Sequence, residues 1–355
     1  MPNDALITII VPTHSHDETL FHSVTSIRNQ TITDINIVVI GDGATEHVRE
    51  VAQDLCVSDS RVSFLDNPKT PRRGELLRDK VIRESSSRFI AYNCDDDLWF
   101  PHHLESLLHV IGDHHFTHPL PILIGADGIP FFMPSDLQRP ESVEWHLSET
   151  PRNTISLSGV MHTRDAYLRL PYGWRETPVG RWTDHYMWQQ FFEQEWFKGI
   201  TSPQATTLKL MAQGRDDFAP GERRRDIESW WDRLHSSTFA QEWDDMVRHA
   251  VWRSSVDHML VSTWREDEIA HLRSHITSLE TEHAQLQSTV HELNAHVQRL
   301  SATNSELLTD LANTQNRLCV IEQRLQLRRN ELQAMHTSRS WKITRPLRAV
   351  RKLFT

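Results

Sequence analysis

This sequence of 355 residues lacks long apolar runs, paired cysteines and metal-ligand spacings. No stretch of about 18 consecutive apolar residues occurs, so we expect no membrane-spanning helix. The three cysteines lie far apart, which favours a reducing compartment and argues against disulfides or a cysteine metal cluster. The 22 histidines show no HExxH or comparable spacing, so no zinc site of that kind is predicted.

The beginning of the chain has neither the basic start nor the small-residue cleavage site of a secretory signal, so we expect a cytoplasmic protein. Apolar residues make up 38% of the chain, which indicates that some part has no thick core of its own. The net charge of −10 is unevenly distributed, because residues 338–355 hold six Lys or Arg and no acid. The acidic remainder argues against general nucleic-acid binding.

What the sequence does contain is a regular alternation of strand and helix patterns over its first 92 residues. Continuous apolar, β-branched runs predict buried strands at residues 6–11, 35–40, 62–65 and 88–92. Apolar residues at helical spacing predict helices at residues 18–29, 48–55 and 76–82. This alternation predicts an α/β fold with a doubly wound, mostly parallel sheet.

Polar and acidic residues follow three of these strands. Pro12 and Thr13 follow the first strand, Asp42 the second, and the triplet 95–97 (Asp-Asp-Asp) the fourth. Ligands of such sheets bind beyond the carboxyl ends of the strands, where carboxylates can hold a ribose hydroxyl or a hard cation. Any one of these residues alone is an ordinary turn former, but their recurrence at successive strand ends favours a nucleotide site.

Five ordered motifs extend this interpretation. They are IIVPTH (residues 9–14), SIRNQT (26–31), INIVVIGDGATE (35–46), YNCDDDLWFPHHL (92–104) and GRWTDHYMW (180–188). In this order and spacing the chain resembles family 2 glycosyltransferases, enzymes of the GT-A fold, over residues 7–210. The resemblance implies a Rossmann-like, mostly parallel sheet that binds a nucleotide sugar and a divalent cation.

Carried over by position, the resemblance places Pro12 and Thr13 in the nucleotide pocket and Asp42 on the base. It places Asp95 on the ribose or sugar side. Arg78 would contact the nucleotide or its phosphates, although two neighbouring arginines, Arg72 and Arg73, compete for that role.

The resemblance further implies a Mn²⁺ or Mg²⁺ ion that bridges the diphosphate. Asp96 is expected to bind this cation, with Asp97 as a second ligand. The usual family pattern has an acid where this chain has Cys94, so the choice among the three aspartates stays open. A cation held there would stabilise the charge that develops on the leaving diphosphate.

Asp184 lies where the family places the base that deprotonates the acceptor hydroxyl. The alternatives are His185 as the base, or Asp184 as a helix N-terminal acid that only stabilises the macrodipole. Four tryptophans of this region either stack on a sugar or belong to the core: Trp99, Trp145, Trp174 and Trp182. The histidine pairs 102–103 and 114–115 are expected to be solvated helix residues.

The C-terminal third predicts helices of two kinds. Residues 221–264 read as short helices whose tryptophans pack on the preceding domain or on a partner. From residue 269 to 335 the spacing of three then four residues predicts a coiled coil, with 16 of 20 core positions apolar. β-branched residues at a positions, leucine at d positions and Asn304 at an a position favour a parallel homodimer. We therefore expect domains at residues 1–215, 216–265, 266–336 and 337–355.

The basic tail, residues 337–355, has apolar residues on one helical face, which favours peripheral contact with an anionic lipid surface such as the inner face of the cytoplasmic membrane. The alternative is a solvated terminus.

Together these features predict an inverting, metal-dependent glycosyltransferase of bacterial cell-surface polysaccharide synthesis. The donor would be a UDP- or dTDP-linked sugar, and the acceptor a glycan or lipid-linked hydroxyl. The alternative is a coiled-coil scaffold whose nucleotide-sugar-binding domain is catalytically inactive. A dinucleotide-dependent enzyme is disfavoured, because no G-x-G-x-x-G turn follows the first strand.

Overall fold

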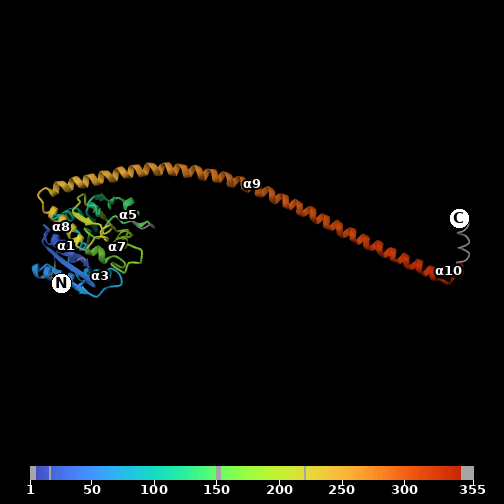
Figure 1. Cartoon of the computed structure of the whole chain (residues 1–355), viewed down its shortest axis with the longest axis horizontal. Coiled ribbons are helices and arrows are strands. Elements are labelled where there is room, and N and C mark those ends of the chain that lie inside the picture. Colours follow the sequence, from blue (N-terminus) through green and yellow to red (C-terminus); the bar gives the residue numbers. More distant parts are fainter. Residues whose placement is uncertain (1–4, 16, 149–152, 220, 345–355) are drawn as a thin grey trace. The chain divides into compact units, whose positions relative to one another are not determined.

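The computed structural model describes residues 5–15, 17–148, 153–219 and 221–344. The chain divides into two compact units, Met1–Val261 and Ser262–Thr355. The first unit contains the sheets and the helices α1 to α8, and the described part of the second contains the continuation of the long helix α9 followed by α10 (Figure 1).

A seven-stranded sheet forms the centre of the first unit, with the strand order β10-β6-β9-β4-β1-β2-β3. Its strands in chain order are β1 (Ile7–Thr13), β2 (Ile35–Asp42), β3 (Val62–Asn67), β4 (Phe89–Tyr92), β6 (Phe116–His118), β9 (Met161–Thr163) and β10 (Gly199–Thr201). Only β9 runs antiparallel to its neighbours, β4 and β6. The predicted mostly parallel sheet is confirmed, and its first four strands lie where the apolar runs predicted them.

Helices cover both faces of this sheet, because successive side chains of a strand point to opposite faces. One face holds α1 (Asp17–Arg28), α2 (Glu46–Ser58) and α4 (His103–Ile111), and the other holds α3 (Glu75–Glu84), α6 (Arg164–Leu168) and α7 (Thr183–Phe192). On β1, Ile9 and Val11 belong to the first core while Ile10 belongs to the second. Each such fully buried aliphatic side chain contributes on the order of 2 kcal/mol to stability.

A second, four-stranded sheet was not predicted. Its order is β5-β11-β7-β8, from β5 (Leu98–Trp99), β11 (Thr207–Leu210), β7 (Ile122–Ile124) and β8 (Pro130–Phe132). It forms a third core with α8 (Glu222–Leu234) and the beginning of α9 (Phe239–Thr337). Trp230 and Trp243 are buried in this core, as expected of packing anchors, whereas Trp252 is exposed. The remaining helices are α5 (Pro140–Leu147) and α10 (Arg339–Ile343).

Helix α9 is 99 residues long. The expectation of only short helices up to residue 264 is therefore wrong beyond Phe239, because the helical backbone continues from the third core into the heptad region without interruption. All 16 apolar core positions of the predicted coiled coil are exposed on this single chain. The pairing of two such helices stays a prediction. Most of the basic tail, residues 345–355, lies outside the described residues.

Among the described residues, no helix combines the length and the apolar character that crossing a membrane requires.

The prediction of solvated helix histidines is wrong for His114 and His115, which lie half-buried beyond the end of α4, and for His103. His103 is fully buried, its Nδ1 lies 2.7 Å from Thr206 Oγ1, and its ring packs on Trp99 with centroids 4.3 Å apart. Burial lowers its pKa to about 3, so the imidazole is neutral. His103 is a core residue and not a solvated one, because Thr206, the residue before β11, supplies its partner from a distant part of the sequence.

Candidate active site

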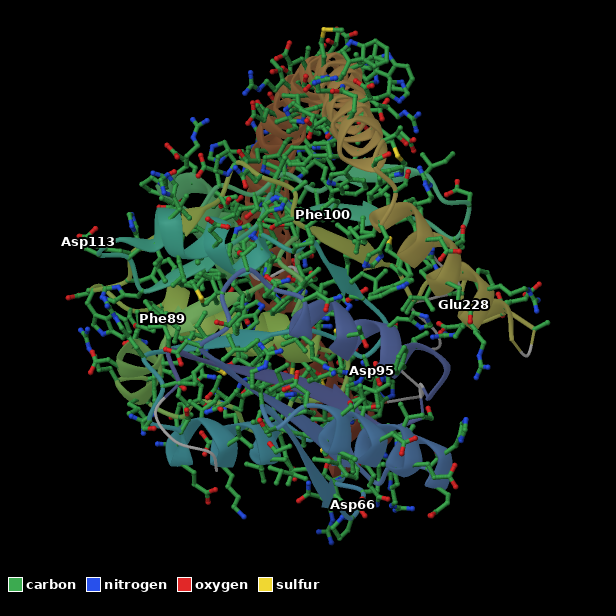
Figure 2. All side chains as sticks on the ribbon, turned by 90° about the vertical axis from the view of Figure 1, so that its left-hand side faces the viewer. Asp66, Phe89, Asp95, Phe100, Asp113 and Glu228 are labelled. Atoms are coloured by element: carbon green, nitrogen blue, oxygen red, sulfur yellow. The ribbon has the colours of Figure 1, made fainter. Side chains whose placement is uncertain are left out.

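A cavity of about 900 Å³ opens beyond the carboxyl ends of β1, β2 and β4. Figure 2 labels Phe89, at the beginning of β4, to the left of Asp95, which lies just past the end of that strand. Seven of the eight predicted site residues line this cavity: Pro12, Thr13, Asp42, Arg78, Asp95, Asp96 and Asp184. The eighth, Asp97, lies buried next to it.

Asp42 ends β2 and is nearly fully buried at the cavity. Its Oδ2 accepts a hydrogen bond from Lys69 Nζ at 2.5 Å, and its Oδ1 accepts one from the backbone N–H of Thr70 at 2.6 Å. Burial opposes ionisation, but these donors lower the pKa of Asp42 below its usual value. Gly43, with φ of +69°, lets the Lys69 backbone approach, since a Cβ at Gly43 would lie 2.6 Å from Lys69 Cβ.

Two buried polar groups in the cavity wall have no hydrogen-bond partner within the described part of the chain. One is Thr13 Oγ1 at the end of β1, and the other is the pair Nε and Nη1 of Arg78. Arg78 Nη2 donates to the carbonyl oxygen of Arg73 at 2.7 Å, and the guanidinium stacks 4.6 Å from the ring centroid of Trp174. A buried cation with unused donors is costly, so this arrangement favours an anionic ligand.

The acidic turn after β4 supplies oxygen ligands to the same cavity. Asp95 and Asp96 both line it, together with Cys94. One ligand atom each of Cys94, Asp96 and Asp97 lies within 4.8 Å of the others. Burial raises the pKa of the Cys94 thiol, so the group is neutral, whereas the carboxylates suit a hard divalent cation. The donor set of this turn therefore fits Mn²⁺ or Mg²⁺.

Both carboxylate oxygens of Asp97 accept hydrogen bonds from other parts of the protein. Its Oδ1 accepts from the Leu210 N–H at 2.8 Å, and its Oδ2 accepts from Lys209 Nζ at 2.8 Å and from the Ser158 hydroxyl. A cation on Asp97 would have to share these oxygens with the Lys209 ammonium. The geometry therefore favours Asp96 over Asp97 as cation ligand, and Asp97 ties the acidic turn to β11.

Burial alone would lower the pKa of Lys209, but the adjacent Asp97 charge raises it well above its usual value. Lys209 is therefore a charged ammonium, and it also lines the cavity.

Asp184 is the second residue of α7 and also lines the cavity. Its Oδ1 accepts hydrogen bonds from Asn153 Nδ2 at 3.0 Å and from the His185 N–H at 2.8 Å. Within the described residues no hydrogen bond is found for Oδ2. One oxygen is thus fixed while the other is available to a ligand.

His185, the alternative base, does not line the cavity. Its Nε2 lies 2.9 Å from the carbonyl oxygen of His146, which can only accept, so Nε2 carries the proton. Burial lowers the pKa of this imidazole. The geometry therefore favours Asp184 over His185.

The four tryptophans separate clearly. Trp99 and Trp174 are buried. Trp174 also lines the cavity, where the Arg78 guanidinium stacks on its ring. Trp182 also lines the cavity but is 52% exposed, and Trp145 is exposed elsewhere, on α5.

Among the polar cavity residues that the sequence analysis missed are Lys69, Asn153 and Lys209. A signal existed for Lys69, which follows the third strand as Asp42 follows the second. A weaker one existed for Lys209, a lysine between two leucines in a short apolar run. Asn153 follows a segment without periodicity, and nothing in the sequence marks it.

Comparison with known proteins finds a family match in the first part of the chain. Residues 8–170 match the model of glycosyl transferase family 2. That range contains β1 to β9 and the acidic turn, so the resemblance to family 2 glycosyltransferases is confirmed for this part of the chain.

Individual relatives match over 91 to 113 residues. The Escherichia coli enzyme UDP-Glc:alpha-D-GlcNAc-diphosphoundecaprenol beta-1,3-glucosyltransferase WfgD is 29% identical over 103 residues, 29% of this chain and 40% of the relative. A GalNAc(5)-diNAcBac-PP-undecaprenol beta-1,3-glucosyltransferase of Campylobacter jejuni is 26% identical over 91 residues, 26% of this chain and 29% of the relative. An uncharacterized glycosyltransferase of Rickettsia bellii is 30% identical over 113 residues, 32% of this chain and 16% of the relative. The chain thus spans less than half the length of each of these relatives.

Among solved structures, the mannosyltransferase PcManGT from Pyrobaculum calidifontis, in complex with GDP-Man and Mn²⁺, aligns with 72% of this chain and 76% of its own. The identity is 15% and the TM-score 0.41.

Proposed function

We propose that this chain is a metal-dependent, inverting glycosyltransferase that moves a sugar from a nucleoside diphosphate to a hydroxyl group of a glycan. One observation carries the proposal. A single cavity gathers a carboxylate at the end of β2, two carboxylates after β4, the buried Arg78 guanidinium and Asp184; within the described residues, two guanidinium nitrogens and Asp184 Oδ2 have no hydrogen-bond partner.

The nucleotide would lie against β1 and β2. Asp42 accepts from the base or ribose, since a carboxylate has lone pairs beyond the two used by Lys69 and Thr70. The unpartnered Nε and Nη1 of Arg78 donate to the diphosphate, and Thr13 Oγ1 hydrogen-bonds the same ligand.

Asp96, with Asp95 beside it, would hold the divalent cation. When bound, the cation stabilises the negative charge that develops on the leaving diphosphate. Asp97 does not bind it in this proposal but fixes the turn through Lys209, Leu210 and Ser158.

Asp184 acts as the base of the transfer step. The acceptor oxygen forms a bond to the anomeric carbon while the bond from that carbon to the diphosphate oxygen breaks, and the hydroxyl proton passes to Asp184 Oδ2. Asn153 and the His185 N–H hold Oδ1, so they orient the free oxygen towards the acceptor. A single displacement from the opposite face inverts the configuration at the anomeric carbon.

The named relatives indicate the class of substrate. WfgD uses UDP-Glc and a sugar linked to diphosphoundecaprenol, and the Campylobacter enzyme also acts on a glycan linked to undecaprenol diphosphate. We extend this to a UDP-sugar donor, with dTDP as the alternative, and a lipid-linked glycan acceptor of surface polysaccharide synthesis. The basic tail would hold the enzyme peripherally at the inner face of the cytoplasmic membrane.

Helix α9 would join two copies of the chain. Its apolar a and d side chains are about half exposed, far more than an isolated soluble helix of this length tolerates, and a second copy of the same helix would cover them.

The test is donor hydrolysis and transfer with Mn²⁺, with and without a chelator, in wild-type protein, Asp96→Ala and Asp184→Asn. We expect the chelator and Asp96→Ala to abolish most activity. Asp184→Asn should lower the transfer rate by about 10²- to 10⁴-fold with nucleotide affinity retained. Asp165→Asn is the matched control, because Asp165 is also an acid in the first turn of a helix but does not line the cavity. Nucleotide-sugar binding without any turnover would support the inactive scaffold instead.

A further inference from the structure

Lys209 occupies an unusual place for a lysine, in the middle of the second sheet. It lies on β11 between Leu208 and Leu210, which are both buried in the third core. Because strand side chains alternate, Lys209 points to the other face of the strand, where it lines the cavity beside the acidic turn.

The Lys209 ammonium is held in place by the buried Asp97 carboxylate. Lys209 Nζ donates to Asp97 Oδ2 at 2.8 Å, and Asp97 is itself held by Leu210 N–H at 2.8 Å. The Lys209 side chain is only 18% exposed. Within the described residues this is its single hydrogen bond, so an ammonium with three donors has two left for the cavity.

The charges next to Lys209 indicate which ligand its two remaining N–H donors can bind. Asp95 and Asp96 lie in the same wall, and a diphosphate brought against them without a cation would be repelled. Two largely buried cations line the cavity at different places. Arg78 comes from α3, and Lys209 lies beside the acidic turn.

We propose that Lys209 binds the diphosphate of the donor directly and gives the site a component of diphosphate affinity that does not need the metal. This inference rests on the proposed function, because it takes the cavity to hold a nucleoside diphosphate. It assigns Lys209 a ligand-binding role beyond its ion pair with Asp97.

The experiment compares the affinities of UDP, UMP and uridine by titration calorimetry, in Mn²⁺ and in excess chelator. In wild-type protein with chelator, UDP should still bind about tenfold or more tightly than uridine. Lys209→Met should reduce this preference, with Arg78 left as a diphosphate donor, and Lys209→Arg should retain it. Lys198→Met is the matched control, since Lys198 also forms a 2.8 Å ion pair, with Asp113, but is exposed and does not line the cavity.

A purely structural role for Lys209 gives a different pattern. Lys209→Met leaves the Asp97 carboxylate buried without its cation, so the double variant Lys209→Met/Asp97→Asn serves as a second, charge-balanced test. If either variant folds and keeps the wild-type preference for UDP over uridine in chelator, the inference is overturned. If wild-type protein binds UDP in Mn²⁺ but shows no preference in chelator, the inference is also overturned while the proposed function stands. If wild-type protein binds no nucleoside diphosphate even with Mn²⁺, the proposed function itself fails.

Discussion

The guanidinium of Arg78 lies over the ring of Trp174, 4.6 Å from its centroid, at the wall of the cavity. The stacking and one hydrogen bond to a backbone carbonyl hold the group, while Nε and Nη1 have no partner in the described part of the molecule. Arg78 is therefore a buried charge whose Nε and Nη1 can donate hydrogen bonds to a ligand.

Arg78→Met should weaken nucleoside diphosphate binding by about 10- to 100-fold, because charge-assisted hydrogen bonds to the diphosphate are lost. The melting temperature should stay the same or rise, since an incompletely paired buried charge is replaced by an apolar side chain of similar length. Calorimetry and thermal unfolding measure the two effects.

Arg169→Met provides the control for this prediction. Arg169 stacks on Trp196 at 3.9 Å but does not line the cavity. Its loss should leave nucleotide binding unchanged. Equal affinities of Arg78→Met and wild-type protein would show that Arg78 has no part in binding.

The sequence predicted the central sheet well for a physical reason. Strands buried on both faces read as continuous apolar runs, and β1, β2 and β4 have such runs. The second sheet could not be predicted in the same way, because β5, β7 and β8 have two or three residues each, too few to show a period.

The site was predictable as a location but not in its details. Residues after parallel strands meet at one edge, so Thr13, Asp42 and Asp95 were found together. The different engagement of Asp97 depends on Lys209, which lies 112 residues further along the chain. No local pattern announces such a partner, and the burial of His103 by Thr206 is hidden for the same reason.

Stability should fall in mildly acidic solution because of buried histidines. Burial lowers the pKa of His103 and His118 to about 3 and that of His162 to about 4. In the unfolded chain these groups take up protons near pH 6.5, whereas the folded chain keeps them neutral. Stability is therefore fully present above pH 6.5 and is lost as the pH falls from there towards 4, by about 1 kcal/mol per pH unit for each histidine between pH 6 and 5.

His103→Asn isolates one of these contributions, because the amide nitrogen can replace Nδ1 as the partner of Thr206. The variant should be less stable than wild-type protein at pH 7.5, but its unfolding free energy should fall less steeply between pH 7.5 and 5. Denaturant unfolding at several pH values measures the slope. His109→Asn, at an exposed position of the same helix, should keep the wild-type slope. Parallel curves for His103→Asn and wild-type protein would contradict the prediction.

Trp182 should contribute to binding of the acceptor sugar and not to hydrolysis of the donor. It lies two residues before Asp184 on the cavity wall and is 52% exposed, so its ring is free to stack on an acceptor sugar. Trp182→Ala should raise the KM for a lipid-linked sugar acceptor about five- to tenfold, with donor hydrolysis unchanged. Trp145→Ala, which removes a 37% exposed ring outside the cavity, should change neither. A loss of donor hydrolysis in Trp182→Ala alone would assign the ring to the donor side.

Helix α9 should hold two chains together through its a and d side chains. Leu293→Lys combined with Leu300→Lys places two charges at d positions that are 58% and 56% exposed in the single chain, and a second copy would have to bury them. Light scattering of the full chain should then give a monomer where wild-type protein gives a dimer. Ala295→Lys combined with Ala302→Lys adds the same charge at f positions and should leave the dimer intact. A monomeric wild-type protein would refute the pairing.

Asn304 sets a further expectation for the same helix. As a polar residue at an a position, it lowers stability but selects a dimer in register, because each amide finds its partner in the other copy. Asn304→Leu should therefore raise the melting temperature of the helical signal and, at the same time, allow assemblies larger than two chains. Donor hydrolysis should be unaffected in this variant, since Asn304 lies in the second unit, Ser262–Thr355, and the cavity residues all lie in the first. A variant that is more stable yet strictly dimeric would show that other residues fix the register of the two helices. The oppositely charged g and e positions, such as Glu268 and Arg273, are then the next residues to exchange.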